Sequence, residues 1–148
     1  MTSANILVLG GSGFVGNYLV PRLDAAGCTV TVPTRNRERA RHLILLPRID
    51  VVQADIHDPA ELDRLVAGKD VVINLVGILH GRMGEDNDPY GPDFRRAHVD
   101  LLQSLVQSAV RNQVSRVIQL SALGVTDSDP ATLPSRYLRS KAAAEKLL

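Results

Sequence analysis

Apolar residues gather along this chain in short runs, and longer segments with helical spacing separate these runs. The runs are rich in Val, Ile and Leu, as strands are when both faces of a parallel sheet are covered. Residues 71–76 (Val-Val-Ile-Asn-Leu-Val) show this composition most clearly. The predicted strands comprise residues 6–9, 28–32, 49–53, 71–76 and 116–120.

The segments between these runs carry apolar residues three and four positions apart, which predicts amphipathic helices. Asp58 and Pro59 are typical of a helix start, as the N-cap and the first helical residue. Pro21 lies inside the first predicted helix, where its ring removes a hydrogen bond, so we expect a kink or an irregular turn there. The predicted helices are a first one that contains Tyr18, Leu19 and Leu23, then residues 36–46, 58–66 and 94–111, and a last one that starts near Arg136 and still continues at Leu148.

This alternation of strands and helices predicts the α/β class. With right-handed crossovers it gives a Rossmann-type doubly wound parallel sheet with the strand order 3-2-1-4-5. A length of 148 residues suits a single domain, residues 1–148, and no repeat or linker divides the chain.

A glycine-rich turn, Gly10-Gly11-Ser12-Gly13-Phe14-Val15-Gly16, joins the first predicted strand to the first helix. A strand, a glycine turn and a helix in this order form the first unit of a dinucleotide-binding fold. Gly10 allows a sharp turn, Gly13 leaves room for a pyrophosphate, and Gly16 lets the helix pack closely. The amides and the dipole at the helix N-terminus favour the phosphate charge. The structural alternative is a tight turn in another kind of α/β protein.

The end of the second predicted strand distinguishes the two nicotinamide dinucleotides. An acidic residue there binds the ribose hydroxyls of NAD, whereas an arginine accommodates the extra phosphate of NADP. This chain has Thr-Arg-Asn-Arg at residues 34–37, and we expect Arg35 to contact the phosphate, which favours NADP(H) over NAD(H). Arg39 and Arg41 follow, and we expect these two to belong to a solvated basic helix face.

Further cofactor contacts are expected where the third and fourth predicted strands end. Asp55, followed by Ile56, is placed to accept a hydrogen bond from the adenine amino group, although a turn or cap role is as common for aspartate. Val76 and Gly77 follow the fourth strand, and the glycine lets the backbone pass close to the cofactor. We expect Asn74 to be a strand residue with a satisfied amide.

Tyr137 and Lys141 are spaced to lie on one face of a helix. A nearby ammonium favours the phenolate, so the tyrosine is expected to exchange a proton with a carbonyl or alcohol while a cofactor exchanges a hydride. Ser121, directly after the fifth predicted strand, can orient the same oxygen, and the ammonium of Lys141 is also expected to bind the nicotinamide ribose of the cofactor. The pair alone is common on helix surfaces, and its position after this serine and this glycine turn makes it a candidate catalytic set.

The amino-acid composition argues against several classes of function. A net charge of +1 and an aromatic fraction of 3% argue against a nucleic-acid binder. The single cysteine, Cys28, suits a reducing compartment, and we expect a cytoplasmic protein. The 4 histidines lack metal-ligand spacing, and no metal is expected. No apolar stretch is long enough to cross a bilayer, since Asn74 interrupts the longest one.

Together these segments resemble the extended or atypical short-chain dehydrogenases/reductases, the NAD(P)-dependent epimerase/dehydratase group. The similarity rests on the glycine turn in its Gly10-x-x-Gly13-x-x-Gly16 spacing, which can also be written Gly11-x-Gly13-x-x-Gly16, and on Asp55. It rests further on Leu-Ser-Ala at 120–122 and on the Tyr-x-x-x-Lys pair. Residues 72–79 and 94–99 resemble bacterial relatives of the NADPH-binding accessory subunit of mitochondrial complex I.

The resemblance implies an NAD(P)(H)-binding domain whose cofactor site and catalytic pair serve a small-molecule substrate that the sequence does not identify. Members are about twice as long, so we expect a fragment truncated before the C-terminal substrate portion, with an uncovered fifth strand and a tendency to form homodimers. Two functions remain open: an oxidoreductase, and a structural or assembly module that holds the nucleotide within a membrane-bound respiratory complex.

Overall fold

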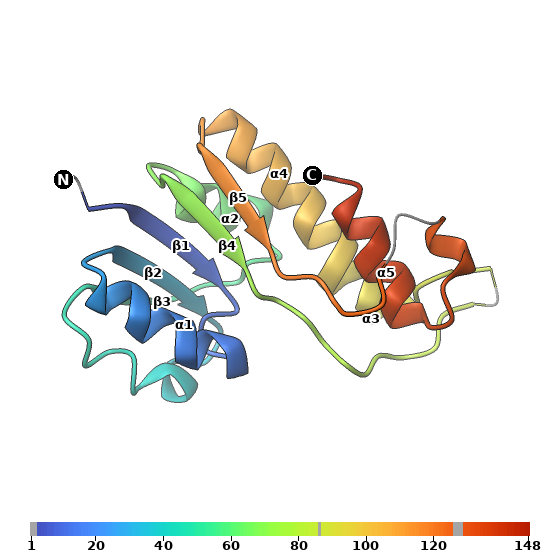
Figure 1. Cartoon of the computed structure of the whole chain (residues 1–148), viewed down its shortest axis with the longest axis horizontal. Coiled ribbons are helices and arrows are strands. Elements are labelled where there is room, and N and C mark those ends of the chain that lie inside the picture. The colour runs from blue at the N-terminus through green and yellow to red at the C-terminus, as the bar shows by residue number, and fades with distance from the viewer. Residues whose placement is uncertain (1–2, 86, 126–128) are drawn as a thin grey trace.

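A parallel five-stranded sheet organises the computed structural model, which describes residues 3–85, 87–125 and 129–148 (Figure 1). The strand order is β3-β2-β1-β4-β5, as the sequence predicts. The strands are β1 (Asn5–Leu9), β2 (Thr29–Thr34), β3 (Ile49–Gln53), β4 (Val71–Asn74) and β5 (Arg116–Gln119).

Helices cover both faces of this sheet (Figure 1). The helical segments are α1 (Phe14–Ala25), the 3₁₀ turn η1 (Arg37–Ala40), α2 (Pro59–Val66), α3 (Pro92–Phe94), the π-helical segment η2 (Arg95–Asp100), α4 (Leu101–Arg111), the 3₁₀ turn η3 (Pro130–Thr132) and α5 (Arg136–Glu145). Within the described residues, no helix is both long and apolar enough to cross a membrane.

The central strand β1 divides the apolar core into two clusters. Ile6 and Val8 point to the face where Val20 of α1 packs. Leu7 and Leu9 point to the other face, against α2 and α4. These four side chains are buried, which explains why β1 is apolar from Ile6 to Leu9 rather than alternating.

Proline is tolerated inside β2 because of where its nitrogen points. In a strand, successive amides face opposite neighbours, and the amide of Thr29 faces β1 while that of Val30 faces β3. By the same alternation the nitrogen of Pro33 faces β1, but the pairing of β1 with β2 ends at Thr31. No ladder hydrogen bond is therefore lost at Pro33.

The predicted helix over residues 36–46 is wrong. The oxygen of the Asn36 side chain accepts a hydrogen bond from the amide of Glu38 and starts only the single turn η1. The amides of Leu43 and Leu46 then donate to carbonyls three residues back, at Ala40 and Leu43. These tight turns already bury Ala40 and Leu43 completely, so a longer amphipathic helix is not needed to cover this edge of the core.

Other boundaries differ from the predictions. The long helix starts at Pro92 and contains the π-helical segment η2. The last helix ends at Glu145 instead of continuing at Leu148, because the last amide bonds span three residues instead of four. α1 continues through Pro21, so the irregular turn predicted there is absent. β4 ends at Asn74, two residues earlier than predicted.

The start of α2 agrees with the prediction. The side chain of Asp58 caps this helix by accepting hydrogen bonds from the amides of residues 60 and 61.

The packing at Gly16 predicts a stability effect. A β-carbon at Gly16 would lie 2.1 Å from the carbonyl oxygen of Gly11, whereas one at Gly13 would lie 3.2 Å from that of Gly10. We expect Gly16→Ala to lower the free energy of unfolding by about 1–3 kcal/mol, with a smaller loss for the control Gly13→Ala. Urea denaturation measures both, and equal stability of the Gly16 variant and the wild type would contradict this packing.

Candidate functional site

The glycine turn lies against the end of β4. Gly10 has a φ of +74°, and a β-carbon there would lie 3.0 Å from the backbone of Leu75 and Val76. The amide of Gly13 donates to the carbonyl of Gly10 at 3.0 Å, which closes the turn. Only glycine fits Gly10, because both the left-handed backbone and the close strand exclude a side chain.

The N-terminus of α1 opens from this turn. Its N-cap residue is Gly13, which supplies no capping side chain, and the first turn contains no acidic residue. The first amides of a helix have no acceptor within the helix, and the helix dipole makes this end positive. This end of α1 can therefore bind an anion such as a pyrophosphate.

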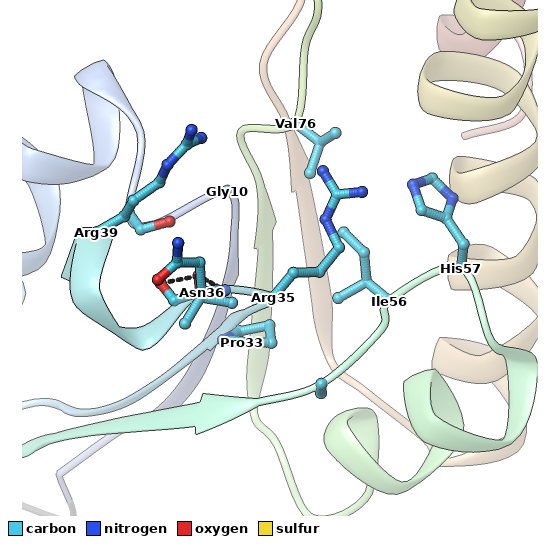
Figure 2. A pocket seen from close by; sticks show the side chains of 11 residues that line it. Gly10, Pro33, Arg35, Asn36, Arg39, Ile56, His57 and Val76 are labelled. Carbon is cyan, nitrogen blue, oxygen red and sulfur yellow. Dashed lines mark hydrogen bonds between the residues drawn. The ribbon is translucent and has the colours of Figure 1, made fainter.

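A first cavity, of about 450 Å³, opens beside the glycine turn at the ends of β2 and β3 (Figure 2). Arg35 extends toward Val76 and His57, and Arg39 lies on the other side, near Gly10 (Figure 2). The cavity is lined by Gly10, Ser12, Pro33, Thr34, Arg35, Asn36, Arg39, Ala54, Ile56, His57 and Val76. No carboxylate is in this lining, as far as the described residues show, so its charged side chains are the two arginines.

A second cavity, of about 350 Å³, lies on the other side of the glycine turn. Its lining residues are Gly10, Ser12, Gly13, Phe14, Val15, Leu75, Val76, Gly77, Leu79, Leu120, Ser121, Tyr137 and Lys141. The two cavities share Gly10, Ser12 and Val76. Together they form an elongated site along the carboxyl edge of the sheet, where ligands of doubly wound folds bind.

The structure brings Ser121, Tyr137 and Lys141 together in the second cavity. Lys141 is buried, and its Nζ donates to the carbonyl oxygens of Leu120 at 3.1 Å and Val76 at 3.4 Å. Burial lowers the pKa of Lys141, and Glu145 partly opposes that change. The amine thus links the ends of β4 and β5 beneath the cavity.

Ser121 carries an unpaired polar atom in the same cavity. Its Oγ is buried and has no hydrogen-bond partner in the described structure. A buried hydroxyl without a partner loses the hydrogen bonds it makes in water, so a bound group with an oxygen or nitrogen atom would stabilise it. This orphaned atom and the glycine cradle both fit a dinucleotide with a polar substrate beside it.

Asp55 follows β3 but does not line the first cavity, whereas its neighbours Ala54 and Ile56 do. Its Oδ1 accepts a hydrogen bond from the amide of His57 at 3.0 Å, and its own amide donates to the carboxylate of Glu61. The turn role that was the alternative is therefore present, and the adenine contact stays a prediction.

Asn74 has the structural role that the sequence predicts. Its Nδ2 donates to Oε1 of Gln119 on β5 at 2.7 Å, and its Oδ1 accepts from the amide of Val76 at 3.1 Å. This buried amide fixes the backbone that follows β4, which lines both cavities.

Sequence reasoning missed the roles of several residues. Asn36, Arg39 and His57 line the first cavity, although only Arg39 stood out in the sequence as part of a basic face. His98 is buried behind the second cavity, where its Nε2 accepts from the amide of Ile78 at 3.1 Å. A polar residue on an otherwise apolar helix face was the available signal for His98.

The fold and the two joined cavities define a class of protein: a doubly wound α/β domain with an elongated ligand site at the carboxyl edge of its sheet. The chain belongs to the NAD(P)H-binding family, whose model matches residues 10–148.

The chain is also similar in sequence to curated proteins that are much longer. The chain is 35% identical over 144 residues to the mitochondrial NADH dehydrogenase [ubiquinone] 1 alpha subcomplex subunit 9 of Arabidopsis thaliana, covering 94% of this chain and 33% of that protein. It is 25% identical over 138 residues to dihydroflavonol 4-reductase of Dianthus caryophyllus, covering 87% of this chain and 37% of that protein. The chain thus spans about a third of the length of these relatives.

A solved structure shows the same fold. A protein from Bacillus halodurans described as an NAD-dependent epimerase/dehydratase superimposes with a TM-score of 0.77 at 23% identity. The match covers 98% of this chain and 64% of that one.

The buried imidazole predicts a pH dependence of stability. Burial, with repulsion from Lys141, lowers the pKa of His98 to about 4. The unfolded chain therefore binds more protons between about pH 4 and pH 6.5, and stability falls as the pH decreases through this range. We expect the wild type to lose roughly 1–3 kcal/mol more than His98→Gln between pH 7 and pH 4 in urea denaturation. Parallel pH profiles of the two proteins would contradict the buried neutral imidazole.

Proposed function

We propose that this chain is the nucleotide-binding part of an oxidoreductase that prefers NADP(H) and transfers a hydride to or from a carbonyl or alcohol. The observation that carries this proposal is that Ser121, Tyr137 and Lys141 line one cavity with the glycine turn. A chain that only held a nucleotide could use the amine to bind the ribose, but it would not need a phenol and an unpaired hydroxyl beside that amine.

The preference for NADP(H) rests on the charge of the first cavity. Arg35 and Arg39 line it, and no carboxylate in the described lining is placed to bind ribose hydroxyls. A guanidinium can hold a phosphate by two parallel hydrogen bonds, which a diol cannot match. Arg35 lies at the end of β2, where the adenosine ribose is expected, so it is the residue that we assign to the 2′-phosphate.

The proton chemistry is assigned to the second cavity. A bound nicotinamide would supply or accept the hydride. Tyr137 would donate its phenolic proton to the substrate oxygen in reduction and accept it in oxidation. The ammonium of Lys141 stabilises the phenolate by its charge, and the free Oγ of Ser121 would hydrogen-bond the same substrate oxygen.

A second function stays open because relatives from several organisms are complex I subunits by name. In this alternative the chain holds its nucleotide without turnover, as part of a respiratory complex. An assay of NADPH absorbance with a panel of carbonyl substrates distinguishes the two functions. An oxidoreductase would lower the absorbance steadily, whereas a structural module would bind the nucleotide and leave the absorbance constant.

Arg35→Ala tests the cofactor assignment. Removing the guanidinium should lower the affinity for NADPH roughly tenfold, which is about 1.4 kcal/mol, and leave that for NADH nearly unchanged. Arg37→Ala is the matched control, because Arg37 is an exposed arginine two residues away that does not line the cavity. Titration of nucleotide fluorescence measures both affinities. Equal losses for the two nucleotides would show that Arg35 does not bind the phosphate.

Tyr137→Phe tests the chemistry in any preparation with measurable carbonyl reduction. Loss of the hydroxyl should lower kcat by about 10²-fold or more while the dissociation constant of NADPH changes little, because only proton transfer is removed. Tyr90→Phe is the control, since Tyr90 does not line the cavity. A Tyr137 variant with unchanged kcat would favour the structural module.

A further inference from the structure

His98 lies behind the second cavity, in the π-helical segment η2 that packs against α5. Its ring stacks on Phe94 at a centroid distance of 5.6 Å and meets the ring of Tyr137 edge to face, also at 5.6 Å. Phe94 meets Tyr137 edge to face as well, at 6.1 Å. The aromatic ring of Tyr137 thus rests against two rings that α3 and η2 hold in place.

The hydrogen bonds of the imidazole have only one consistent direction. The amide of Ile78 can only donate, so Nε2 of His98 accepts, at 3.1 Å. Because the pKa of His98 is lowered to about 4, the ring is neutral and its single proton is on Nδ1. Nδ1–H then donates to Oγ of Ser140 at 2.8 Å, and Ser140 donates to the carbonyl of Tyr137 at 2.7 Å.

This series of bonds joins two walls of the cavity. Ile78 follows Gly77, which lines the cavity on the β4 side, while Ser140 and Tyr137 belong to α5 on the other side. A β-carbon at Gly77 would lie 3.5 Å from Nζ of Lys141 and 3.9 Å from Nε2 of His98. One imidazole therefore spans the gap between the segment after β4 and the helix that carries the phenol and the amine.

We propose that His98 is a positioning residue for Tyr137: through Ile78 and Ser140 it fixes the phenol relative to the backbone wall at Gly77. His98 does not line the cavity, so it contacts neither substrate nor cofactor and is not itself catalytic. The inference rests on the proposed function, in which Tyr137 is the proton donor. Hydrogen-bond partners alone are expected for any buried histidine, but here the two partners belong to opposite walls of the cavity, the segment after β4 and α5.

The first experiment needs no variant and no activity. In the full chain with ¹⁵N-labelled histidine, the nitrogen chemical shifts of His98 should show a neutral ring with the proton on Nδ1 at pH 7 and still at pH 5.5. His42, an exposed histidine whose Nε2 contacts the side chain of Asn17, serves as the internal reference. A proton on Nε2, or a charged His98 ring at pH 5.5, would overturn the proposed series of hydrogen bonds.

The second experiment separates hydrogen bonding from packing. His98→Phe keeps a buried ring but removes both hydrogen bonds, whereas His98→Gln keeps an acceptor for Ile78 and a donor for Ser140. In hydrogen exchange, the amide of Ile78 should lose protection in the Phe variant and regain most of it in the Gln variant, because only glutamine restores the acceptor. The amide of Leu75, which donates to the carbonyl of Leu9, should keep its protection in both variants.

The kcat of the same two variants gives a second measurement of the positioning role. The Phe variant should lose about tenfold in kcat with an unchanged dissociation constant for NADPH, and the Gln variant should recover most of it. His42→Gln should behave as the wild type in both measurements. The positioning role is overturned if the Phe variant leaves both the exchange of the Ile78 amide and kcat unchanged, or if the Gln variant is as impaired as the Phe variant.

The two levels of proposal fail in different ways. Failure of the wild type to bind NADPH, or full activity of the Tyr137→Phe protein, would reject the proposed function. The tautomer of His98 and the hydrogen exchange of the Ile78 amide would still test the positioning role, because neither measurement depends on nucleotide or substrate.

Discussion

The site depends on the absence of side chains where the glycine turn meets the sheet. A β-carbon at Gly16 would lie 2.1 Å from the oxygen of Gly11, and one at Gly10 would lie 3.0 Å from the backbone after β4. This close approach puts the N-terminus of α1 directly above the ends of β1 and β4. It also lets two cavities meet at one turn, so that a single elongated ligand can have its anionic centre on the helix amides.

Charge and burial give the two ends of the site different properties. The end beside β2 and β3 is open and lined by exposed arginines, which suits a phosphate that arrives from water. The end beside β4 and β5 holds a buried lysine, a buried unpaired hydroxyl and, behind them, a neutral histidine. Buried polar groups interact strongly with one another, which is why the proposal assigns the proton transfer to this end.

The sequence predicted the strand order, the glycine turn and the meeting of Ser121, Tyr137 and Lys141, because these depend on apolar runs and on local spacing. It did not predict that residues 36–46 form only short turns, since Ala40 and Leu43 are buried in a core cluster that strands and a helix distant in the sequence build. The π-helical segment was also missed, and so were the hydrogen bonds of His98, whose partners lie 20 and 42 residues away in the sequence. Local sequence patterns therefore predict the sheet and the glycine turn, whereas the contacts of His98 behind Tyr137 depend on tertiary structure.

The most direct test is a crystal structure of the protein with NADP⁺ bound. The account predicts one dinucleotide across both cavities, with its pyrophosphate on the amides at the start of α1. Its 2′-phosphate should lie on the guanidinium of Arg35, and its nicotinamide should lie beside Tyr137 and Lys141. A nucleotide whose 2′-phosphate points to solvent, or whose nicotinamide lies outside the second cavity, would contradict the account.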